Sequence, residues 1–358
     1  MTMMNQYIFT RGHLQIKLFL NDLEETEDGD KIIQGDIVVP NSTDLHDLFK
    51  KSTSNVISLW PFGQISYRFH HSVNNEVKNI IRDALKEWEE YTCLKFHEKI
   101  IDWWYLRFRT DKAGFSLQAK LSRCWSFIGH PLMPFEGQDV SIGQGCATKG
   151  IVIHEVGHAI GLHHEQSRLD RGNHIKILWE NIPLSKHSQF HLTLDFNHQV
   201  KYDLSSIMHY STMAFSKKAF EKNTIVSRNP HLQRLMGRSN SLSFRDVKLT
   251  NKVYMCDFLC PNKNELNCKN DGYISPYRHD NKPCHCVCPP HTVGEYCESV
   301  VDYYYDSLPC GGNITQETII QTPQYPSRKP YDSCSWWIQA PNGKRVKVEF
   351  IDFSFIPR

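Results

Sequence analysis

The sequence HEVGHAIGLHHEQSR begins at His154. Its residue types and their spacing are those of a metal site that catalyses hydrolysis. His154 and His158 are four residues apart, so they face the same side of a helix and both imidazoles can reach one ion. Glu155 faces the open side of that ion, where its carboxylate can take a proton from metal-bound water. Gly161 tolerates a positive φ, so the helix can end there and the chain can return with His164 as a third ligand. Three neutral imidazoles with one open position are typical of a catalytic zinc ion rather than a structural one.

A second motif, SIMHY at residues 206–210, follows the metal motif and carries Met208. An extended His-Glu-x-x-His motif followed by a methionine turn is the signature of the metzincins. With HEVGHAIGLHHEQSRLDR and SIMHY together, the chain resembles the astacin family of zinc endopeptidases. Shorter matches agree with this resemblance and lie at residues 60–61, 65–67, 142–146, 179–182 and 242–246. The resemblance covers roughly residues 52–258 and extends weakly into both flanks.

The resemblance implies a role for each residue of this site. His154, His158 and His164 are the expected ligands of one zinc ion in the catalytic domain. Glu155 is expected to be the general base that deprotonates the zinc-bound water, and then the acid that protonates the leaving amine. Tyr210 corresponds to the family's tyrosine, which can ligate zinc at rest and swing to stabilise the oxyanion. Together these roles describe a zinc metalloendopeptidase.

Two more residues are expected to support the site. By resemblance, Met208 forms an apolar floor beneath the imidazoles. In the family, the carboxylate at the position of Glu165 meets the new N-terminus of the mature enzyme, so that activation is coupled to cleavage. Arg168, Asp170 and Arg171 are expected to form structural ion pairs around this carboxylate.

Residues 1–51 are polar, acidic in the middle, and resemble the family's propeptide. Gln34-Gly35-Asp36 resembles its Gly-Asp latency element, in which the carboxylate of Asp36 would stand in for the catalytic water on zinc. The alternative is that Gly35-Asp36 is only a turn, which the same dipeptide also favours. Lys50-Lys51 could be the site that an activating protease cleaves, although exposed dibasic pairs are common.

The twelve cysteines indicate an oxidising compartment, because six of them fall between Cys260 and Cys297. A second zinc site at Cys284, Cys286 and Cys288 is disfavoured, since Cys-x-Cys-x-Cys lacks the two-residue gap of the usual zinc knuckles. Residues 259–299 resemble an EGF-like module, and residues 310–358 resemble the first half of a CUB domain. Sequence alone does not select the pairing. The resemblance implies Cys93–Cys256, Cys124–Cys146, Cys260–Cys284, Cys268–Cys286, Cys288–Cys297 and Cys310–Cys334.

The pattern of elements predicts an α+β catalytic domain over residues 52–258, with strands first and helices later. In the family, the zinc helix divides a sheet-bearing upper lobe from an irregular lower one. Strands are expected at residues 64–69, 102–110 and 346–350, and helices at 151–162 and 245–254. Another helix should bury one face, made of Val77, Ile80, Ala84, Trp88 and Tyr91.

Charge and hydropathy exclude several classes of partner. Lys and Arg number 41 against 39 Asp and Glu, and their even spread gives no indication of a nucleic-acid or membrane-surface partner. No apolar run is long enough for a transmembrane helix, and residues 1–20 lack the apolar core of a signal peptide. We nevertheless expect a secreted protein, whose ends in this sequence differ from the natural ends. Asn41 and Asn313 stand in sequons for N-glycosylation.

The substrate is weakly specified by the sequence. Arg228, Arg234 and Arg238 lie where the family builds part of its primed-side pocket, which suggests a preference for acidic residues after the scissile bond. The order astacin, EGF and CUB, common in nematodes, suggests matrix, cuticle or egg-coat proteins as substrates. Two rivals remain: a matrix-binding protein with a silent protease, and a gene fragment that is not expressed or misfolds.

Overall fold

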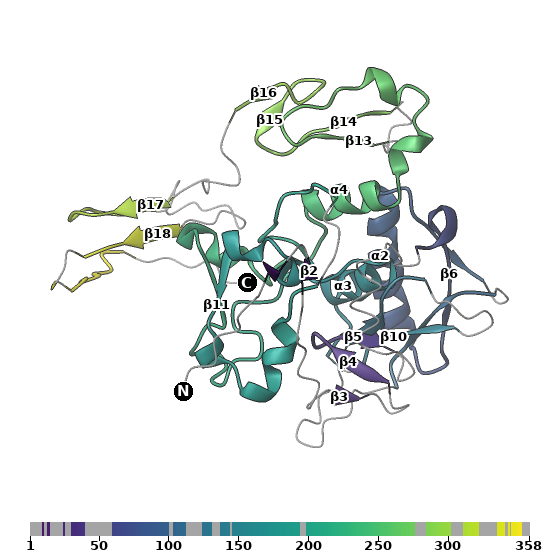
Figure 1. The fold of residues 1–358 in the computed structure, drawn as a ribbon, viewed down its shortest axis with the longest axis horizontal. Coiled ribbons are helices and arrows are strands. Elements are labelled where there is room, and N and C mark those ends of the chain that lie inside the picture. The colour runs from purple at the N-terminus through teal and green to yellow at the C-terminus, as the bar shows by residue number, and fades with distance from the viewer. Residues whose placement is uncertain are drawn as a thin grey trace.

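An eight-stranded mixed sheet and three α-helices surround the metal motif in the computed structural model, so the predicted α+β class is confirmed (Figure 1). The structure describes residues 30–39, 59–99, 103–111, 124–130, 137–143, 145–193, 198–275, 284–301, 311–321, 335–340, 343 and 345–352, and the backbone of residues 9–10, 13–14 and 24–25. None of the helices in these segments is long and apolar enough to cross a membrane.

Five strands between residues 64 and 141 form one part of the sheet, and a strand from residues 1–51 continues it beyond β9. Strands β6, β8 and β10 lie side by side and parallel, while β7 extends one edge and β9 pairs antiparallel with β10 at the other. The predicted strand at 64–69 is observed, whereas the one expected at 102–110 is only four residues long. The bounds are β6 Gln64–Phe69, β7 Lys95–Glu98, β8 Leu106–Arg109, β9 Trp125–Phe127 and β10 Gln138–Ser141.

Three strands from residues 1–51 continue this sheet, which the sequence did not predict. Strand β5 (Ile37–Val39) runs parallel to β9, and β4 (Lys31–Ile33) and β3 (Glu24–Glu25) follow it antiparallel. The apolar side chains of Ile32 and Val38 pack with Trp125 in a small core of their own. The turn before β5 is therefore held at the end of the catalytic sheet, next to the zinc motif.

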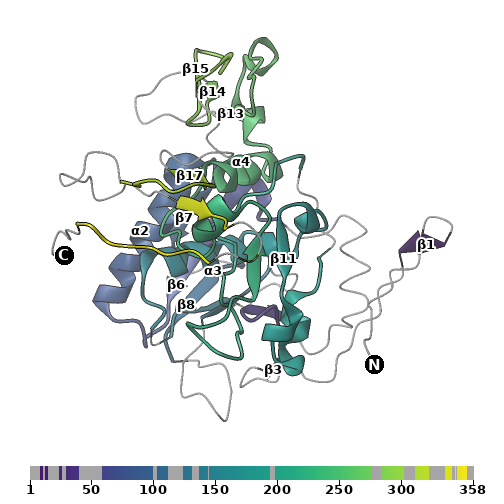
Figure 2. The ribbon, with the colours of Figure 1, turned by 90° about the vertical axis from the view of Figure 1, so that its left-hand side faces the viewer.

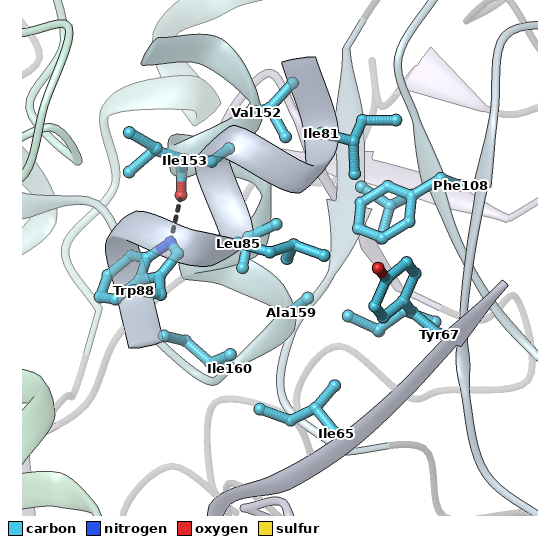
Figure 3. Packing of buried hydrophobic residues seen from close by; sticks show 14 of the residues in the cluster. Ile65, Tyr67, Ile81, Leu85, Trp88, Phe108, Val152, Ile153, Ala159 and Ile160 are labelled. Atoms are coloured by element: carbon cyan, nitrogen blue, oxygen red, sulfur yellow. Dashed lines mark hydrogen bonds between the residues drawn. The ribbon is translucent and has the colours of Figure 1, made fainter. Parts of the chain in front are cut away.

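Helix α2 (Asn75–Tyr91) packs across the sheet and begins at Asn74, whose side chain accepts a hydrogen bond from the amide of Val77. Its buried face differs from the predicted one, because Ile81 and Leu85 are fully inside. Tyr91, the last residue of the helix, is 48% exposed. Figure 3 shows Ile81, Leu85 and Trp88 converging on the zinc helix, where the indole of Trp88 donates to the carbonyl of Ile153 at 3.3 Å.

The zinc helix α3 (Lys149–Ala159) lies between two apolar cores and is itself apolar on nearly all sides. It begins two residues before the predicted start, at the Thr148 cap, and it ends before Gly161, which has a φ of 103°. The upper core joins α3 to the sheet and to α2. The lower core contains Phe190, Tyr210 and Ile225, so two lobes meet at this helix, as the resemblance implied.

The lower lobe is built largely from short elements. Strand β11 (Ile175–Ile177) pairs with β12 (Ile225–Ser227), and helix α4 (Phe244–Val253) follows, near its predicted position. Ser243 and Asp246 form a capping box at the start of α4. The 3-10 helices of the described segments are Pro61–Gly63, Glu165–Ser167, Arg171–Asn173, Trp179–Asn181, Leu184–Phe190, Pro230–Leu235, Cys256–Leu259 and Lys263–Glu265.

Short strand pairs and disulfides make up the C-terminal part. The structure contains the bridges Cys93–Cys256, Cys124–Cys146, Cys260–Cys284, Cys268–Cys286 and Cys288–Cys297, the pairs that the resemblance implied. Cys310, Cys334 and Asn41 lie outside the described residues. The pairs are β13 (Tyr273–Ser275) with β14 (His285–Val287), β15 (Thr292–Val293) with β16 (Ser299–Val300), and β17 (Gly311–Ile314) with β18 (Ser335–Ile338); near the N-terminus, β1 (Phe9–Thr10) pairs with β2 (His13–Leu14).

The strand expected at 346–350 is absent from the described residues, and this prediction was wrong. Its alternating apolar side chains, Val346, Val348 and Phe350, are exposed rather than packed. A period-two pattern forms a strand only where a neighbouring strand accepts its backbone hydrogen bonds, and residues 346–350 have no paired strand in the described part of the chain.

Candidate metal centre

Three imidazoles converge at the end of α3, where the chain turns back beneath it. His154 and His158 are on successive turns of the helix, and His164 follows the turn that Gly161 makes possible. The ring centroids are 4.8 Å apart for His154 and His158, 5.2 Å for His154 and His164, and 4.6 Å for His158 and His164. The structure therefore brings together the three residues predicted as ligands.

The second nitrogen of each ring is held by an oxygen. Nδ1 of His154 is 2.7 Å from the carbonyl of Ile207, and Nδ1 of His158 is 2.8 Å from the carbonyl of Leu162. Nδ1 of His164 is 3.1 Å from the side-chain oxygen of Gln34. An oxygen acceptor at Nδ1 requires the proton there, so each Nε2 presents a lone pair to the common point.

The donors at this point fit a zinc ion. Nε2 of His158, Nε2 of His164 and Oδ1 of Asp36 are fully buried and make no hydrogen bond with the described residues. The three imidazoles and Asp36 each offer one ligand atom, all within 4.8 Å of one another. Buried lone pairs without donors are costly, and a zinc ion accepts imidazole and carboxylate ligands in four-coordinate sites. Burial lowers the pKa of His164 to about 4, so that imidazole is neutral at physiological pH, as a ligand must be.

Asp36, which lies just before strand β5, reaches all three imidazoles. Its carboxylate oxygens lie 3.2 Å from Nε2 of His154, 3.6 Å from Nε2 of His158 and 3.1 Å from Nε2 of His164. Burial would raise the pKa of this carboxyl, but the imidazoles outweigh it and hold the pKa well below its usual value. The carboxylate is thus ionised where it faces the ligands.

Glu155 lies beside the imidazoles and is only 1% exposed. Its Oε2 atom is fully buried and has no hydrogen-bond partner among the described residues. Burial, and next the charge of Asp36, raises the pKa of Glu155 well above its usual value. The side chain therefore has a free acceptor oxygen beside the metal ligands.

Tyr210 and Met208 close the site from the lower lobe. The hydroxyl of Tyr210 donates to the main-chain oxygen of Gln34, and its ring lies 4.6 Å from that of His164. Met208 is 2% exposed and packs against Gly157 of α3, so that a Cβ there would meet its sulfur at 2.6 Å. Both residues predicted from SIMHY thus touch the helix or its ligands.

Glu165 is paired inside the lower lobe. Its Oε1 accepts from Nη1 of Arg168 at 3.0 Å and from the amide of Asp203 at 2.7 Å. Burial raises the pKa of Glu165 to about 8 despite these partners. Arg168 also binds Asp170, as predicted, whereas Arg171 donates to the carbonyls of residues 166 and 190.

Two residues around the site were missed by sequence reasoning. Gln34 is 3% exposed and binds both His164 and Thr193, the latter at 2.7 Å. Asp246 binds Ser206 at 2.6 Å and the amide of Ile207 at 2.9 Å, and so fixes the SIMHY turn. The only signal for Gln34 was its place before Gly35-Asp36, and the Ser-x-x-Asp spacing of a helix cap was available for Asp246.

A cavity of about 660 Å3 opens beside the site and is lined by Asp36, Glu155 and Tyr210 as well as by Arg238. Of the three arginines considered for the substrate pocket, only Arg238 lines it. Arg228 instead donates to the carbonyl of residue 172, and Arg234 lies in the 3-10 helix at 230–235.

A His-Glu-x-x-His helix, a third histidine after a glycine turn and a buried methionine that packs against the helix define the metal site of a metzincin zinc peptidase. The model of the astacin peptidase family matches residues 52–255, more than half of the chain, and the chain belongs to this family. The CUB domain model matches residues 310–356. These matches confirm the predicted resemblance and a zinc metalloendopeptidase domain with zinc as its cofactor.

Two relatives agree in sequence with this assignment. Blastula protease 10 of Paracentrotus lividus is 34% identical over 319 residues, which are 85% of this chain and 49% of that protein. Zinc metalloproteinase dpy-31 of Caenorhabditis elegans is 38% identical over 299 residues, 80% of this chain and 46% of that protein. Among solved structures, high choriolytic enzyme 1, a hatching enzyme zinc-protease from Oryzias latipes, matches with 28% identity and a TM-score of 0.49, covering 57% of this chain and 96% of that chain. The chain spans about half the length of the curated relatives it matches.

Proposed function

We propose that this chain is a secreted, zymogen-type zinc endopeptidase that hydrolyses internal peptide bonds of extracellular proteins. The observation that carries the proposal is the convergence of three imidazoles on one point, beside a cavity that is lined by His154 and the buried Glu155. The proposed organisation is a propeptide at 1–51, the catalytic domain at 52–258, an EGF-like module at 259–299 and part of a CUB domain from 310 onward.

His154, His158 and His164 would hold the zinc ion, which when bound supplies a Lewis acid and a nucleophilic water at neutral pH. Glu155 acts as the general base, because its free Oε2 can accept a proton from the attacking water. The water oxygen bonds to the peptide carbonyl carbon and the C–N bond breaks. Glu155 passes its proton to the leaving amine nitrogen, so the products are a carboxylate and an amine. Tyr210, once separated from Gln34, turns its hydroxyl to the developing oxyanion.

The direct test compares the full chain with its Glu155→Ala variant after limited cleavage behind Lys51. Zinc content and hydrolysis of internally quenched peptides are measured for both. We expect equal zinc content and at least a roughly hundredfold loss of kcat/KM in the variant, the usual contribution of a general base. Zinc bound without activity in the unaltered protein would refute the peptidase and favour the rival, a matrix-binding protein with a silent protease domain.

We also propose that Asp36 keeps the chain latent until the prosegment is cleaved. The support is its position, because the carboxylate faces all three ligands and lies in the cavity that a substrate must enter. Glycine at residue 35 lets the turn that carries Asp36 fit into the site, because a Cβ there would lie 2.8 Å from the ring of Phe215. On activation, the carboxylate of Glu165 would leave its ion pair with Arg168 and pair with the new N-terminal amine.

The intact, uncleaved chain tests latency. Asp36→Ala should hydrolyse peptide without processing, whereas the unaltered chain and Asp30→Ala, a matched carboxylate of the same segment, should not. If the intact Asp36→Ala chain were as inactive as the unaltered one, this carboxylate would not be the latency element. The activating protease would act between the prosegment and the catalytic domain, with Lys50-Lys51 as the candidate bond.

Arg238 is proposed to favour acidic residues after the scissile bond. It lines the cavity and forms no ion pair with the residues that the structure describes. For paired peptides with Asp or Asn at that position, Arg238→Gln should lower the preference for Asp about tenfold, in the range of one charge-assisted hydrogen bond. Arg228→Gln is the control, and an equal preference in all three proteins would refute the assignment.

Secretion is supported by the five disulfides among the described residues and by the family. Matrix, cuticle or egg-coat proteins are the proposed substrates. Asn313 is exposed and is a candidate glycosylation site, although its side chain lies 3.0 Å from Nε2 of His231. Mass spectrometry of protein secreted from eukaryotic cells tests both the export and the modification at Asn41 and Asn313.

A further inference from the structure

A buried ion cluster joins the disulfide-rich segment 259–299 to helix α4. The carboxylate of Asp271 lies 3.3 Å from the guanidinium of Arg245 and contacts the ammonium of Lys248, which also donates to the main-chain oxygen of Asp271 at 2.8 Å. These three side chains are 9%, 7% and 6% exposed, respectively. Figures 1 and 2 both place β13 and β14 beside α4, and the rings of Phe244 and Tyr273 pack there at 5.4 Å.

The disulfide-rich segment holds Asp271 in position before it meets α4. Asn270 and Asp271 have positive φ angles of 46° and 71°, a conformation that costs energy unless the surroundings impose it. The side-chain amide of Asn270 donates to the carbonyl of Cys297 at 2.7 Å. Gly272 lies so close to Cys297 that a Cβ would meet its sulfur at 2.7 Å. The bridge Cys288–Cys297 therefore anchors the turn that presents the carboxylate.

Helix α4 in turn fixes the metal site. Its capping residue Asp246 accepts hydrogen bonds from the hydroxyl of Ser206 at 2.6 Å and from the amide of Ile207 at 2.9 Å. The carbonyl of Ile207 is the oxygen that holds Nδ1 of His154. Displacement of the first turn of α4 would therefore move the acceptor that orients a zinc ligand.

A second connection runs through Arg245. Its guanidinium also donates to the carbonyl of Tyr202 at 2.7 Å. The next residue, Asp203, donates its amide to Glu165, which follows the ligand His164. Through Arg245, the ion cluster thus contacts the backbone just before the SIMHY turn.

We propose that Asp271 is a positioning residue of the zinc site, and that the disulfide-rich segment 259–299 is part of the catalytic unit rather than a separate appendage. Asp271 neutralises two buried cations on the first turns of α4, which keeps Asp246 against the SIMHY turn and Ile207 against His154. Loss of its charge leaves both cations buried with one carboxylate fewer, which favours movement of α4 toward water. The proposal rests on the same zinc site as the proposed function.

The test measures metal binding, so it does not depend on peptide hydrolysis. The full chain and Asp271→Asn are loaded with zinc, and release into excess chelator is followed with a zinc indicator, well below either melting temperature. Substitution of a residue that orients a metal ligand typically alters metal affinity about 10- to 100-fold. We therefore expect zinc release from the variant to be at least about tenfold faster. With Co2+ in place of zinc, the visible spectrum of the variant should also change.

Two matched variants separate positioning from general damage. Lys248→Met combined with Asp271→Asn restores the net charge of the cluster and should recover most of the unaltered release rate. Asp257→Asn removes a carboxylate from the half-exposed pair with Lys263 at the same junction and should change nothing. A lower melting temperature in Asp271→Asn with an unaltered release rate and cobalt spectrum would refute the proposal and leave the segment as a tether.

A measurement on the unaltered protein covers the case in which Asp271→Asn does not fold. Coupling between two sites is reciprocal, so removal of zinc should speed amide hydrogen exchange at residues 244–253 and 270–275. Exchange at residues 311–314 should not change. Equal exchange at residues 270–275 with and without zinc would overturn the proposal. All these results could be obtained even if the chain had no peptidase activity. Failure of the proposed function and failure of this proposal can therefore be distinguished.

Discussion

Gly157 lies on the face of α3 that meets the methionine turn, and its replacement by alanine tests that packing. A Cβ at this position would lie 2.6 Å from the sulfur of Met208 and 3.2 Å from its methyl carbon. Alanine is favoured over glycine in a helix by about 1 kcal/mol, so helix propensity alone predicts that Gly157→Ala is stabilising. Overpacking in a full core costs about 1–3 kcal/mol, which opposes that gain.

The structure favours the overpacking cost, because the side chain of Met208 is only 2% exposed within the upper core and its backbone is also held. Its amide donates to the hydroxyl of Ser206 at 3.0 Å, and its carbonyl accepts from the amide of Glu165 at 3.0 Å. We therefore expect Gly157→Ala to lower the free energy of unfolding by about 1 kcal/mol, or about 2–4 °C in melting temperature for a domain of this size. Zinc release should also become faster, since Met208 packs against the helix that carries His154 and His158.

The assay is thermal unfolding of the zinc-loaded full chain, followed by near-ultraviolet circular dichroism, in a double-mutant cycle with Met208→Ala. In the Met208→Ala background the steric cost is absent, so Gly157→Ala should raise the melting temperature instead. Gly172→Ala is the control, because a Cβ there has nothing within 4 Å. A higher melting temperature for Gly157→Ala in the unaltered background would refute the packing argument.

Three further predictions follow from contacts away from the ligands. Replacing Cys93 and Cys256 by serine opens a loop of 163 residues, which should cost about 4–5 kcal/mol in the chain-entropy model and lower the melting temperature by about 10 °C or more in calorimetry. Tyr254→Phe removes the hydroxyl that donates to the carbonyl of residue 160 at 2.9 Å, so unfolding in urea should show a loss of about 1–2 kcal/mol; no loss would mean that water replaces the bond. Burial would raise the pKa of Asp271, but Lys248 and Arg245 outweigh it and lower the pKa. A lowered pKa stabilises the fold above the unfolded value of about 3.9, and this stability is lost as the pH falls through the folded pKa. Below about pH 4 the unaltered chain should therefore lose stability more steeply than Asp271→Asn, and parallel pH profiles would contradict this sign.

The residues predicted from the sequence are those whose chemistry depends on spacing along a single element. His154, His158 and Glu155 lie on one helix, and Gly161 marks the turn to His164. The four-residue spacing and one glycine were therefore sufficient to predict the ligands and the glutamate beside them. The pairing of β5 with β9 was not predictable, because strand addition depends on which edge of the sheet is exposed. The buried face of α2 was only partly predicted, since the sheet rather than the helix pattern decides that Tyr91 extends into solvent.

The roles of Gln34 and Asp271 show a second limit. Each contacts side chains more than twenty positions away, and the sequence neighbours of each are ordinary turn residues. Long-range hydrogen bonds of this kind follow from the assembled fold and leave no periodic pattern in the chain. A single sequence therefore predicts metal ligands more readily than the residues that orient them.

The proposed latency depends on several contacts acting together. The carboxylate of Asp36 faces the imidazoles, the side chain of Gln34 binds His164 and Thr193, and β5 pairs with β9. As a separate peptide, the prosegment would bind weakly through these contacts. In the intact chain, the covalent connection keeps it at a high effective concentration. Cleavage between the prosegment and the catalytic domain removes that advantage for all three contacts at once. The same carboxylate and amide that occupy the site in the intact chain would then dissociate, and the cavity beside Glu155 would be open to substrate.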